Sequence, residues 1–182
     1  MENTAKNYLF ANDYLHDAWR LAAQVKNSGW RPDVLIALWR GGAPVGVAVH
    51  EFLKVSGLSI RHLPLKCKSY AGIEDNSLGV TFECAEEVLA SLKPGEKVLV
   101  VDDVFDTGTP AEAMVRRLAE RNGEMRLACV YWKPTKNQTT LRPDFVVNEV
   151  LDRWIVFPHE IEGLTPDEIR EKDPMLADLL ER

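Results

Sequence analysis

Two continuous apolar runs constrain the fold of this 182-residue chain more than any other feature. The first occupies residues 33–39 (DVLIALW) and the second residues 98–101 (VLVV). Each run is too short for a typical helix and lacks the polar alternation of a half-exposed strand, so each predicts a strand that is covered on both faces. The first is followed by Arg40-Gly41-Gly42 and the second by Asp102-Asp103. Polar and glycine-rich segments therefore stand at strand ends, where ligands bind in parallel sheets.

Segments with helical periodicity alternate with the strands. The first has apolar residues at helical spacing from Leu15 to Val25 and stops at Ser28-Gly29, which predicts an N-terminal amphipathic helix. Because Pro64 cannot donate to a ladder, its strand is expected near an edge of the sheet. The remaining expected elements are helices at 44–55, 83–92, 111–122 and 165–182, strands at 60–66 and 125–132, and a long mobile loop at 67–79. This alternation predicts a single α/β domain with a mainly parallel central sheet flanked by helices.

Charge and composition exclude several classes of function. The net charge of −6 argues against nucleic acid or an anionic membrane as a partner. No apolar run approaches the roughly 20 residues of a membrane helix, and the start MENTAKNYLF lacks the plan of a signal peptide, so a cytoplasmic location is expected. The three cysteines form no CxxC pair and the four histidines no metal-ligand spacing, which favours structural roles for all seven.

The acidic segment after the second run predicts a binding site. Burying Asp102 or Asp103 without a partner would cost several kcal/mol, so each needs water, a cation or hydrogen-bond donors. The following Asp106-Thr107-Gly108-Thr109 leads into a helix, with Thr109 as the expected cap and Pro110 as the first helical residue. Helix N–H groups, a glycine and two hydroxyls form a phosphate cradle. Carboxylates beside such a cradle favour a ribose phosphate as ligand.

Other nucleotide-binding and signalling patterns fit less well. The chain has neither GxGxxG nor GxxxxGK[ST]. VLVVDD also resembles the first strand and acidic pair of response-regulator receiver domains. Such a domain needs an aspartate at the end of a later strand, where this chain has Asn148, and too little chain follows to complete the fold. A receiver domain is therefore set aside.

The segment VLVVDDVFDTGTP, residues 98–110, resembles the phosphoribosyl pyrophosphate (PRPP) motif of type I phosphoribosyltransferases. In the same order, ALWRGG (37–42) is similar to the pyrophosphate loop of that family and KSYAG (68–72) to its flexible catalytic loop. YWKP (131–134) and RWIVFPHE (153–160) resemble the purine-binding parts of hypoxanthine, guanine and xanthine phosphoribosyltransferases. Pro110 departs from the family loop, which usually has Thr or Ser there, so one hydroxyl and one N–H are missing.

The resemblance implies transfer of 5-phosphoribosyl from PRPP to a 6-oxopurine (hypoxanthine, guanine or xanthine), with release of pyrophosphate in purine salvage. It also implies Mg²⁺ as cofactor, a homodimer or homotetramer, and one domain over 1–182 whose small hood comes from parts of the N-terminal and 133–182 regions. The alternative is a non-catalytic or regulatory protein of the same fold that binds PRPP or a nucleotide. The roles implied are catalysis for Asp106, Ser69 and Tyr70; PRPP binding for Arg40, Gly41, Asp102, Asp103, Asp106, Thr107, Gly108 and Thr109; purine binding for Lys133, Trp154 and Ile155; and metal binding for Asp102, Asp103 and Glu160.

Overall fold

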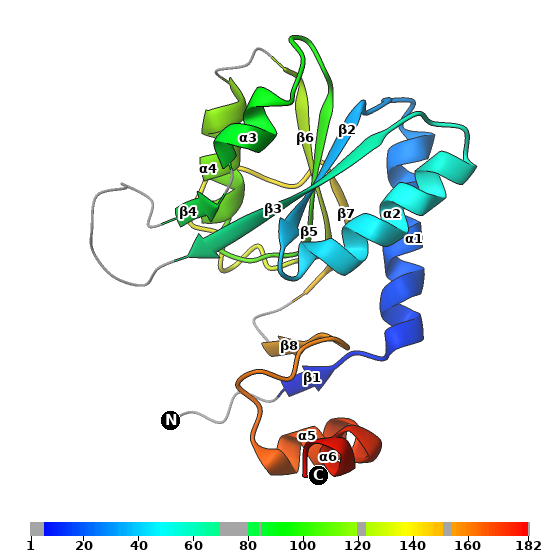
Figure 1. Cartoon of the computed structure of the whole chain (residues 1–182), viewed down its shortest axis with the longest axis vertical. Helices are drawn as coiled ribbons and strands as arrows, with labels where there is room; N and C mark the ends of the chain where they lie inside the picture. Colours follow the sequence, from blue (N-terminus) through cyan, green and yellow to red (C-terminus); the bar gives the residue numbers. More distant parts are fainter. Residues whose placement is uncertain (1–5, 70–79, 84, 120–122, 151–153, 182) are drawn as a thin grey trace. The chain divides into compact units, whose positions relative to one another are not determined.

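The chain divides into two compact units, which are described separately. The computed structural model describes residues 6–69, 80–83, 85–119, 123–150 and 154–181 (Figure 1). We call residues 15–152 the sheet unit, and residues 1–14 together with 153–182 the terminal unit. The expectation of one domain with a small hood stays a prediction.

The sheet unit is built on six strands in the order β4-β3-β2-β5-β6-β7. All neighbouring pairs are parallel except β3 and β4. The chain moves outward from β2 to β3, crosses back to β5 on the other side of β2, and continues outward to β6 and β7. The connection changes direction between β2 and β5, and open α/β sheets bind ligands at such a point. The strands are β2 Val34–Trp39, β3 Arg61–Ser69, β4 Val80–Glu83, β5 Val98–Phe105, β6 Met125–Trp132 and β7 Phe145–Glu149.

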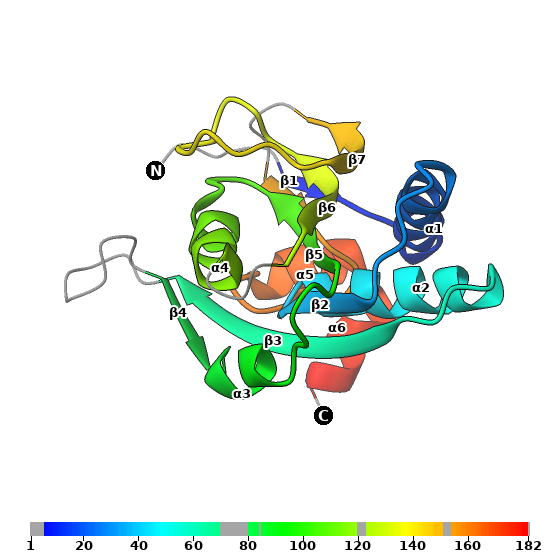
Figure 2. The ribbon, with the colours of Figure 1, turned by 90° about the horizontal axis from the view of Figure 1, so that it is seen from above.

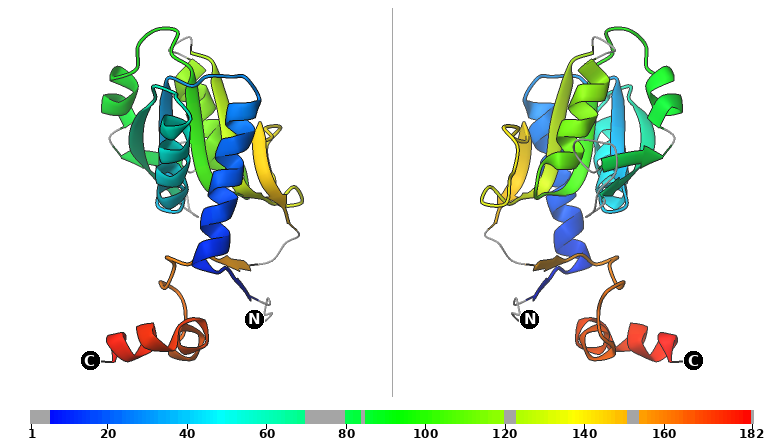
Figure 3. Two further views of the ribbon diagram at one scale, coloured as in Figure 1. Left: turned by 90° about the vertical axis from the view of Figure 1, so that its right-hand side faces the viewer. Right: turned by 90° about the vertical axis from the view of Figure 1, so that its left-hand side faces the viewer.

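Helices cover both faces of this sheet (Figure 2). Figure 3 shows α1 (Ala11–Asn27) and α2 (Gly42–Val55) in front of one face, and α4 (Thr109–Ala119) in front of the other. The face under α4, together with the short α3 (Ala85–Ala90), buries Ile36, Val100 and Met114 in one apolar cluster. Alternate residues of the same strands, such as the fully buried Leu35 and Leu99, point to the opposite face. The predicted α/β class with a mainly parallel, helix-flanked sheet is confirmed, and no described helix is long and apolar enough to span a membrane.

Several predicted boundaries are wrong for identifiable reasons. β3 continues to Ser69, three residues beyond the expected end, because Lys66–Ser69 pair with β4, which was not predicted. Pro64 lies in an inner strand, but β4 pairs with β3 only from Lys66 onward, so one side of the strand has no β4 partner at Pro64. The rest of the expected mobile loop, 70–79, lies outside the described residues. The helix expected at 83–92 is shorter, because β4 takes its start.

The terminal unit pairs the two ends of the chain. β1 (Lys6–Tyr8) and β8 (Trp154–Val156) form a two-stranded parallel sheet. The single helix expected at 165–182 is two helices, α5 (Pro166–Lys172) and α6 (Pro174–Leu180). A capping box starts α5, with Thr165 and Glu168 each accepting the backbone N–H of the other. Asp173 caps α6, so Asp173-Pro174 ends one helix and starts the next.

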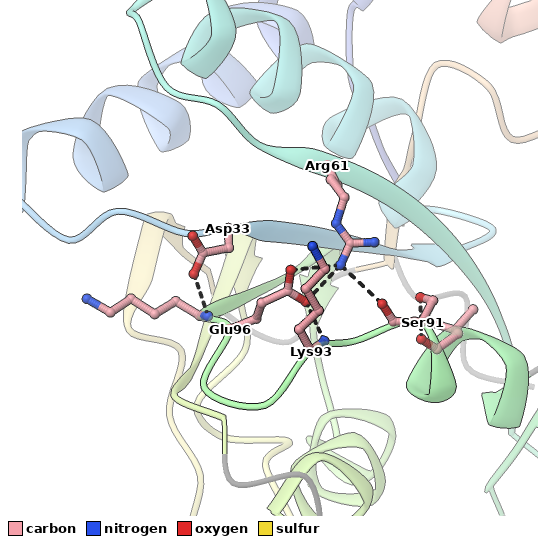
Figure 4. A network of polar contacts seen from close by, with 7 residues as sticks. Asp33, Arg61, Ser91, Lys93 and Glu96 are labelled. Carbon is pink, nitrogen blue, oxygen red and sulfur yellow. Dashed lines mark hydrogen bonds and ion pairs between the residues drawn. The ribbon is translucent and has the colours of Figure 1, made fainter.

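A group of hydrogen-bonded side chains joins the amino-terminal ends of β2, β3 and β5 (Figure 4). Gly41 and Asp103 lie toward the opposite, carboxyl ends of these strands. Arg61 donates to both carboxylate oxygens of Glu96, at 3.0 and 2.7 Å, and Glu96 also accepts the N–H of Lys93 at 2.8 Å. We expect Glu96→Ala to lower the free energy of unfolding by about 1 kcal/mol, because a two-oxygen ion pair and a backbone partner are lost. Urea unfolding measures this; a loss of ligand binding at unchanged stability would contradict a purely structural role.

We expect His62 to make the stability of the fold depend on pH. Its Nε2 is buried with no hydrogen-bond partner among the described residues, and its ring centroid lies 5.3 Å from that of His50. Burial first, and then the nearby His50, lower the pKa of His62 below its usual 6.5. The unfolded chain therefore binds this proton more readily, so stability is full above about pH 6.5 and falls as the pH drops toward the folded-state pKa. We expect His62→Gln to flatten the pH dependence of urea unfolding between pH 7.5 and 5; an unchanged slope would contradict the assignment.

Candidate functional site

The turn after β2 lies directly against the acidic residues of β5. A Cβ added to Gly41 would lie 1.9 Å from Oδ2 of Asp103, and one added to Gly42 would lie 2.5 Å from the carbonyl oxygen of Val101. Gly41 has φ −67°, which any residue adopts, so space rather than backbone conformation requires glycine there. The Trp39–Arg40 peptide bond that precedes this turn is cis. The turn after β2 and the strand β5 thus meet at Gly41 and Asp103, at the switch point of the sheet.

Asp102 and Asp103 lie inside β5, which continues to Phe105, rather than after its end as expected. Asp103 is 6% exposed, and its Oδ1 accepts the N–H of Val104 at 2.8 Å. Asp102 Oδ1 accepts the N–H of Asp103 at 3.0 Å. Removal from water raises the pKa of Asp102 well above its usual range, and the neighbouring carboxylate of Asp103 adds to the effect. A cation or hydrogen-bond donors would therefore stabilise this pair in its charged form.

The nearby thiol of Cys129 shares this environment. Cys129 lies opposite Asp102 in the parallel ladder of β5 and β6 and is 1% exposed. Burial, with the negative charge of Asp102, raises the pKa of Cys129 above its usual value. The thiol therefore stays protonated and unreactive, as expected for a structural cysteine.

The predicted phosphate loop follows β5 and borders a cavity of about 200 Å³. Asp102, Asp106, Thr107 and Gly108 line it together with Pro110. α4 begins at Thr109, so Thr109 is its first residue rather than the expected cap, and the Thr107 hydroxyl accepts the N–H of Thr109 at 3.3 Å. Gly108 has φ +78°, a conformation that favours glycine. The cavity thus joins a carboxylate, a hydroxyl and a helix start, as a phosphorylated sugar requires.

A polar connection between β6 and β7 supports this loop, and no sequence pattern indicated it. A Cβ on Gly108 would lie 2.6 Å from Thr139 Oγ1 and 2.7 Å from Asn137 Oδ1. The N–H of Gln138 donates to the carbonyl oxygen of Thr107 at 2.9 Å. Asn137 accepts the N–H and the hydroxyl of Thr139, at 3.0 and 2.9 Å. The segment therefore fixes the shape of the phosphate loop from outside.

Lys133, predicted for purine binding, is paired with Asp106, predicted for catalysis and PRPP binding. Lys133 follows β6 and is only 8% exposed, and its Nζ lies 3.3 Å from Oδ2 of Asp106. The other oxygen of Asp106, Oδ1, is buried with no hydrogen-bond partner among the described residues. The backbone N–H of Lys133 donates to the carbonyl oxygen of Phe105 at 2.9 Å, which keeps the two residues adjacent. Oδ2 of Asp106 thus pairs with the ammonium of Lys133, and Oδ1 could accept a hydrogen bond from a ligand.

The other predicted residues are found as follows. Arg40 is exposed in the turn before α2, Ser69 is the last residue of β3, and Tyr70 lies outside the described residues. In the terminal unit, Trp154 is 57% exposed, with Lys6 Nζ at 5.8 Å from its ring centre, and Ile155 is buried.

Glu160, predicted as a metal ligand, has local backbone partners in the terminal unit. Its carboxylate accepts the N–H of Phe157 at 3.3 Å, and its carbonyl oxygen accepts from Lys172, which also donates to the carbonyl of Phe157 at 2.7 Å. The structure thus gives Glu160 a role in fixing the segment after β8.

Comparisons with known proteins identify the family of this chain. A model of the phosphoribosyl transferase domain matches residues 5–164. The hypoxanthine-guanine phosphoribosyltransferase of Pan troglodytes is 29% identical over 145 residues, which are 75% of this chain and 65% of the relative. The match thus spans about two thirds of the length of that relative.

Solved structures share the fold. The purine phosphoribosyltransferase of Pyrococcus horikoshii Ot3 matches with a TM-score of 0.67 and 25% identity, over 88% of this chain and 97% of that one. A protein of Neisseria gonorrhoeae with bound ppGpp matches with a TM-score of 0.71 and 23% identity, over 96% and 99%. Since the family model covers most of the chain and the acidic pair, phosphate loop and glycine turn occupy the switch point of the sheet, the chain belongs to the phosphoribosyl transferase domain family.

Proposed function

We propose that this protein is a purine phosphoribosyltransferase that transfers 5-phosphoribosyl from PRPP to a 6-oxopurine and releases pyrophosphate. The observation that carries the proposal is the junction at the switch point, where Gly41 lies on the carboxylate of Asp103 beside the cavity lined by Asp102, Asp106 and Gly108. The similarity to hypoxanthine-guanine and purine phosphoribosyltransferases supports the class of base.

Each part of the junction has a task in this reaction. The loop from Asp106 to Thr109 would bind the 5-phosphate through N–H groups and hydroxyls. Asp102 and Asp103 would accept hydrogen bonds from the ribose hydroxyls, and Arg40 with Gly41 would bind the pyrophosphate. The transition state carries positive charge on the sugar, which nearby carboxylates stabilise. Asp106 would hold the proton of the purine imidazole ring, and Lys133, freed from Asp106, would donate to the 6-oxo group.

Magnesium fits the acidic pair. Burial first, and then the neighbouring carboxylate of Asp103, raise the pKa of Asp102, so a cation would favour the charged form of the pair. Among the described residues, no group of three or more His, Cys, Asp or Glu side chains forms a complete metal site. Mg²⁺ commonly binds one or two carboxylates and takes its other ligands from water and phosphate oxygens. Asp102 and Asp103 would thus hold a metal that comes with the diphosphate and neutralises the leaving group.

A panel of bases tests the proposal. The full chain is incubated with Mg²⁺ and PRPP and with hypoxanthine, guanine, xanthine, adenine or uracil, and pyrophosphate release is measured. We expect release that depends on a 6-oxopurine and stops when Mg²⁺ is removed with EDTA. Release without any base, or with uracil alone, would overturn the 6-oxopurine assignment.

A second candidate is a regulatory protein of the same fold that binds a nucleotide or PRPP without turnover. It is favoured by Pro110, which lines the cavity where the family loop usually has a hydroxyl residue. The relative crystallised with ppGpp shares the fold over nearly the whole chain and binds a phosphorylated nucleotide. Tight binding of PRPP or ppGpp with no pyrophosphate release from any base would favour this candidate.

A further inference from the structure

A second hollow lies on the sheet unit, outside the cavity of the phosphate loop. Its volume is about 660 Å³, within the range of sites that hold nucleotide-sized molecules. Its lining comes from the end of β6, the connection to β7 and the end of β7. The two hollows have no lining residue in common. The lining residues are Trp132, Pro134, Asn137, Thr139, Thr140, Arg142 and Glu149.

Two exposed side chains of opposite charge, Arg142 and Glu149, stand in this lining. Neither Arg142 nor Glu149 makes a hydrogen bond or ion pair with any residue that the structure describes, and no ion pair joins them to each other. Elsewhere in the sheet unit, charged side chains such as Arg61 and Glu96 or Arg117 and Glu86 pair with each other. The hollow thus offers a single ligand the guanidinium of Arg142 as a hydrogen-bond donor and the carboxylate of Glu149 as an acceptor.

The remaining lining adds two further chemical features. Trp132 is half-buried, packs against the apolar cluster under α4, and lies beside Glu149 in the ladder of β6 and β7. Its indole provides an aromatic surface next to the carboxylate. Thr140 is exposed and brings a hydroxyl close to Arg142 in the sequence. Aromatic, hydroxyl, cationic and anionic groups therefore share one concave surface.

We propose that this hollow binds a purine nucleoside monophosphate of the guanine type. The guanidinium of Arg142 suits a phosphate, which it can contact with two parallel N–H groups. The carboxylate of Glu149 suits the adjacent ring N–H and 2-amino group of guanine, since a carboxylate accepts two parallel hydrogen bonds. An amino acid would satisfy both charges but leave most of the volume empty. A divalent cation would have only one carboxylate as ligand.

The site is independent of the proposed catalysis but adjacent to it. Asn137 and Thr139, which line the hollow, are the same side chains that lie against Gly108 of the phosphate loop. A bound nucleotide would therefore touch the support of the phosphate loop without entering its cavity.

Calorimetry with GMP tests the proposal on the full chain. The titration is made in Mg²⁺ and saturating PRPP, so that GMP cannot enter the proposed catalytic cavity. We expect one GMP to bind per chain, and Arg142→Ala or Glu149→Gln to weaken this binding about tenfold or more. AMP, which lacks the paired donors, should bind more weakly and should not respond to Glu149→Gln. The matched control is Arg116→Ala on α4, which should leave GMP binding unchanged.

Two results would overturn the assignment: no GMP binding under these conditions, or binding that survives both variants. These outcomes are separate from a failure of the proposed function. Should the chain bind no PRPP, dependence of GMP binding on Arg142 and Glu149 would still support the hollow, because neither residue lines the catalytic cavity.

Discussion

Asp106→Asn is expected to lower the turnover number for 6-oxopurines by roughly 10²–10⁴, the usual contribution of a general acid or base. Asparagine keeps the shape of Asp106 and an oxygen for Lys133 but cannot exchange a proton. Steady-state pyrophosphate release measures the effect, with urea unfolding of the same sample to verify the fold. Turnover near that of the wild type would remove Asp106 from catalysis.

The choice of asparagine matters because of the buried ammonium of Lys133. Asp106→Ala would leave this cation, 8% exposed, without its 3.3 Å partner, and the cost of an unpaired buried charge would confuse lost catalysis with lost stability. The matched control is Asp33→Asn. Asp33 accepts the N–H of Lys97 at 2.9 Å at the opposite edge of the sheet, so this variant should keep full turnover.

Gly41→Ala is expected to lower kcat/KM for PRPP by about 10² or more and the free energy of unfolding by roughly 1–3 kcal/mol. The added methyl would lie 1.9 Å from Asp103 Oδ2. Asp103 is buried and held by the N–H of Val104, so the carboxylate can yield only by leaving its position in the site. Kinetics at varied PRPP and Mg²⁺, with thermal unfolding, measure both effects.

Gly57→Ala separates the two effects. Gly57 follows α2 with φ +89° and nothing within 4 Å of an added Cβ, so alanine there strains the backbone by about 1 kcal/mol without touching the site. We expect lower stability with unchanged kcat/KM. Equal losses of kcat/KM in the two variants would show that the steric contact between Gly41 and Asp103 has no special role.

The central strands could be predicted because their signal is local. The apolar runs became β2 and the first half of β5, and the polar turn at Arg40-Gly41-Gly42 follows β2 as expected, whereas Asp102-Asp103 lie inside β5. The short strands β1, β4 and β8 were missed because three or four residues carry no pattern of their own and are ordered by distant partners. The division at Asp173-Pro174 was missed, although an aspartate followed by proline is a pattern typical of a helix start.

The sequence predicted which residue types form the site, but it did not predict the contacts between them. The carboxylates, the hydroxyls and the one glycine at 102–109 indicate a ribose phosphate site from chemistry alone. That Gly41 lies on Asp103 depends on the register of β2 against β5. The support of Gly108 by Asn137 and Thr139 depends on the path of a polar connection without a motif.

The pairing of β2 with β5 also has a consequence for folding kinetics. Asp33 and Lys97 bond at the start of these strands across a separation of 64 residues. A contact of this range forms only after a long loop has closed, which slows folding, whereas the backbone hydrogen bonds within α1 and α4 join residues that are close in the sequence. In refolding from urea, helical circular dichroism should return first and PRPP binding last. A nascent chain released before residue 102 would lack the acidic pair, so the site can be assembled only after β5 has been synthesised.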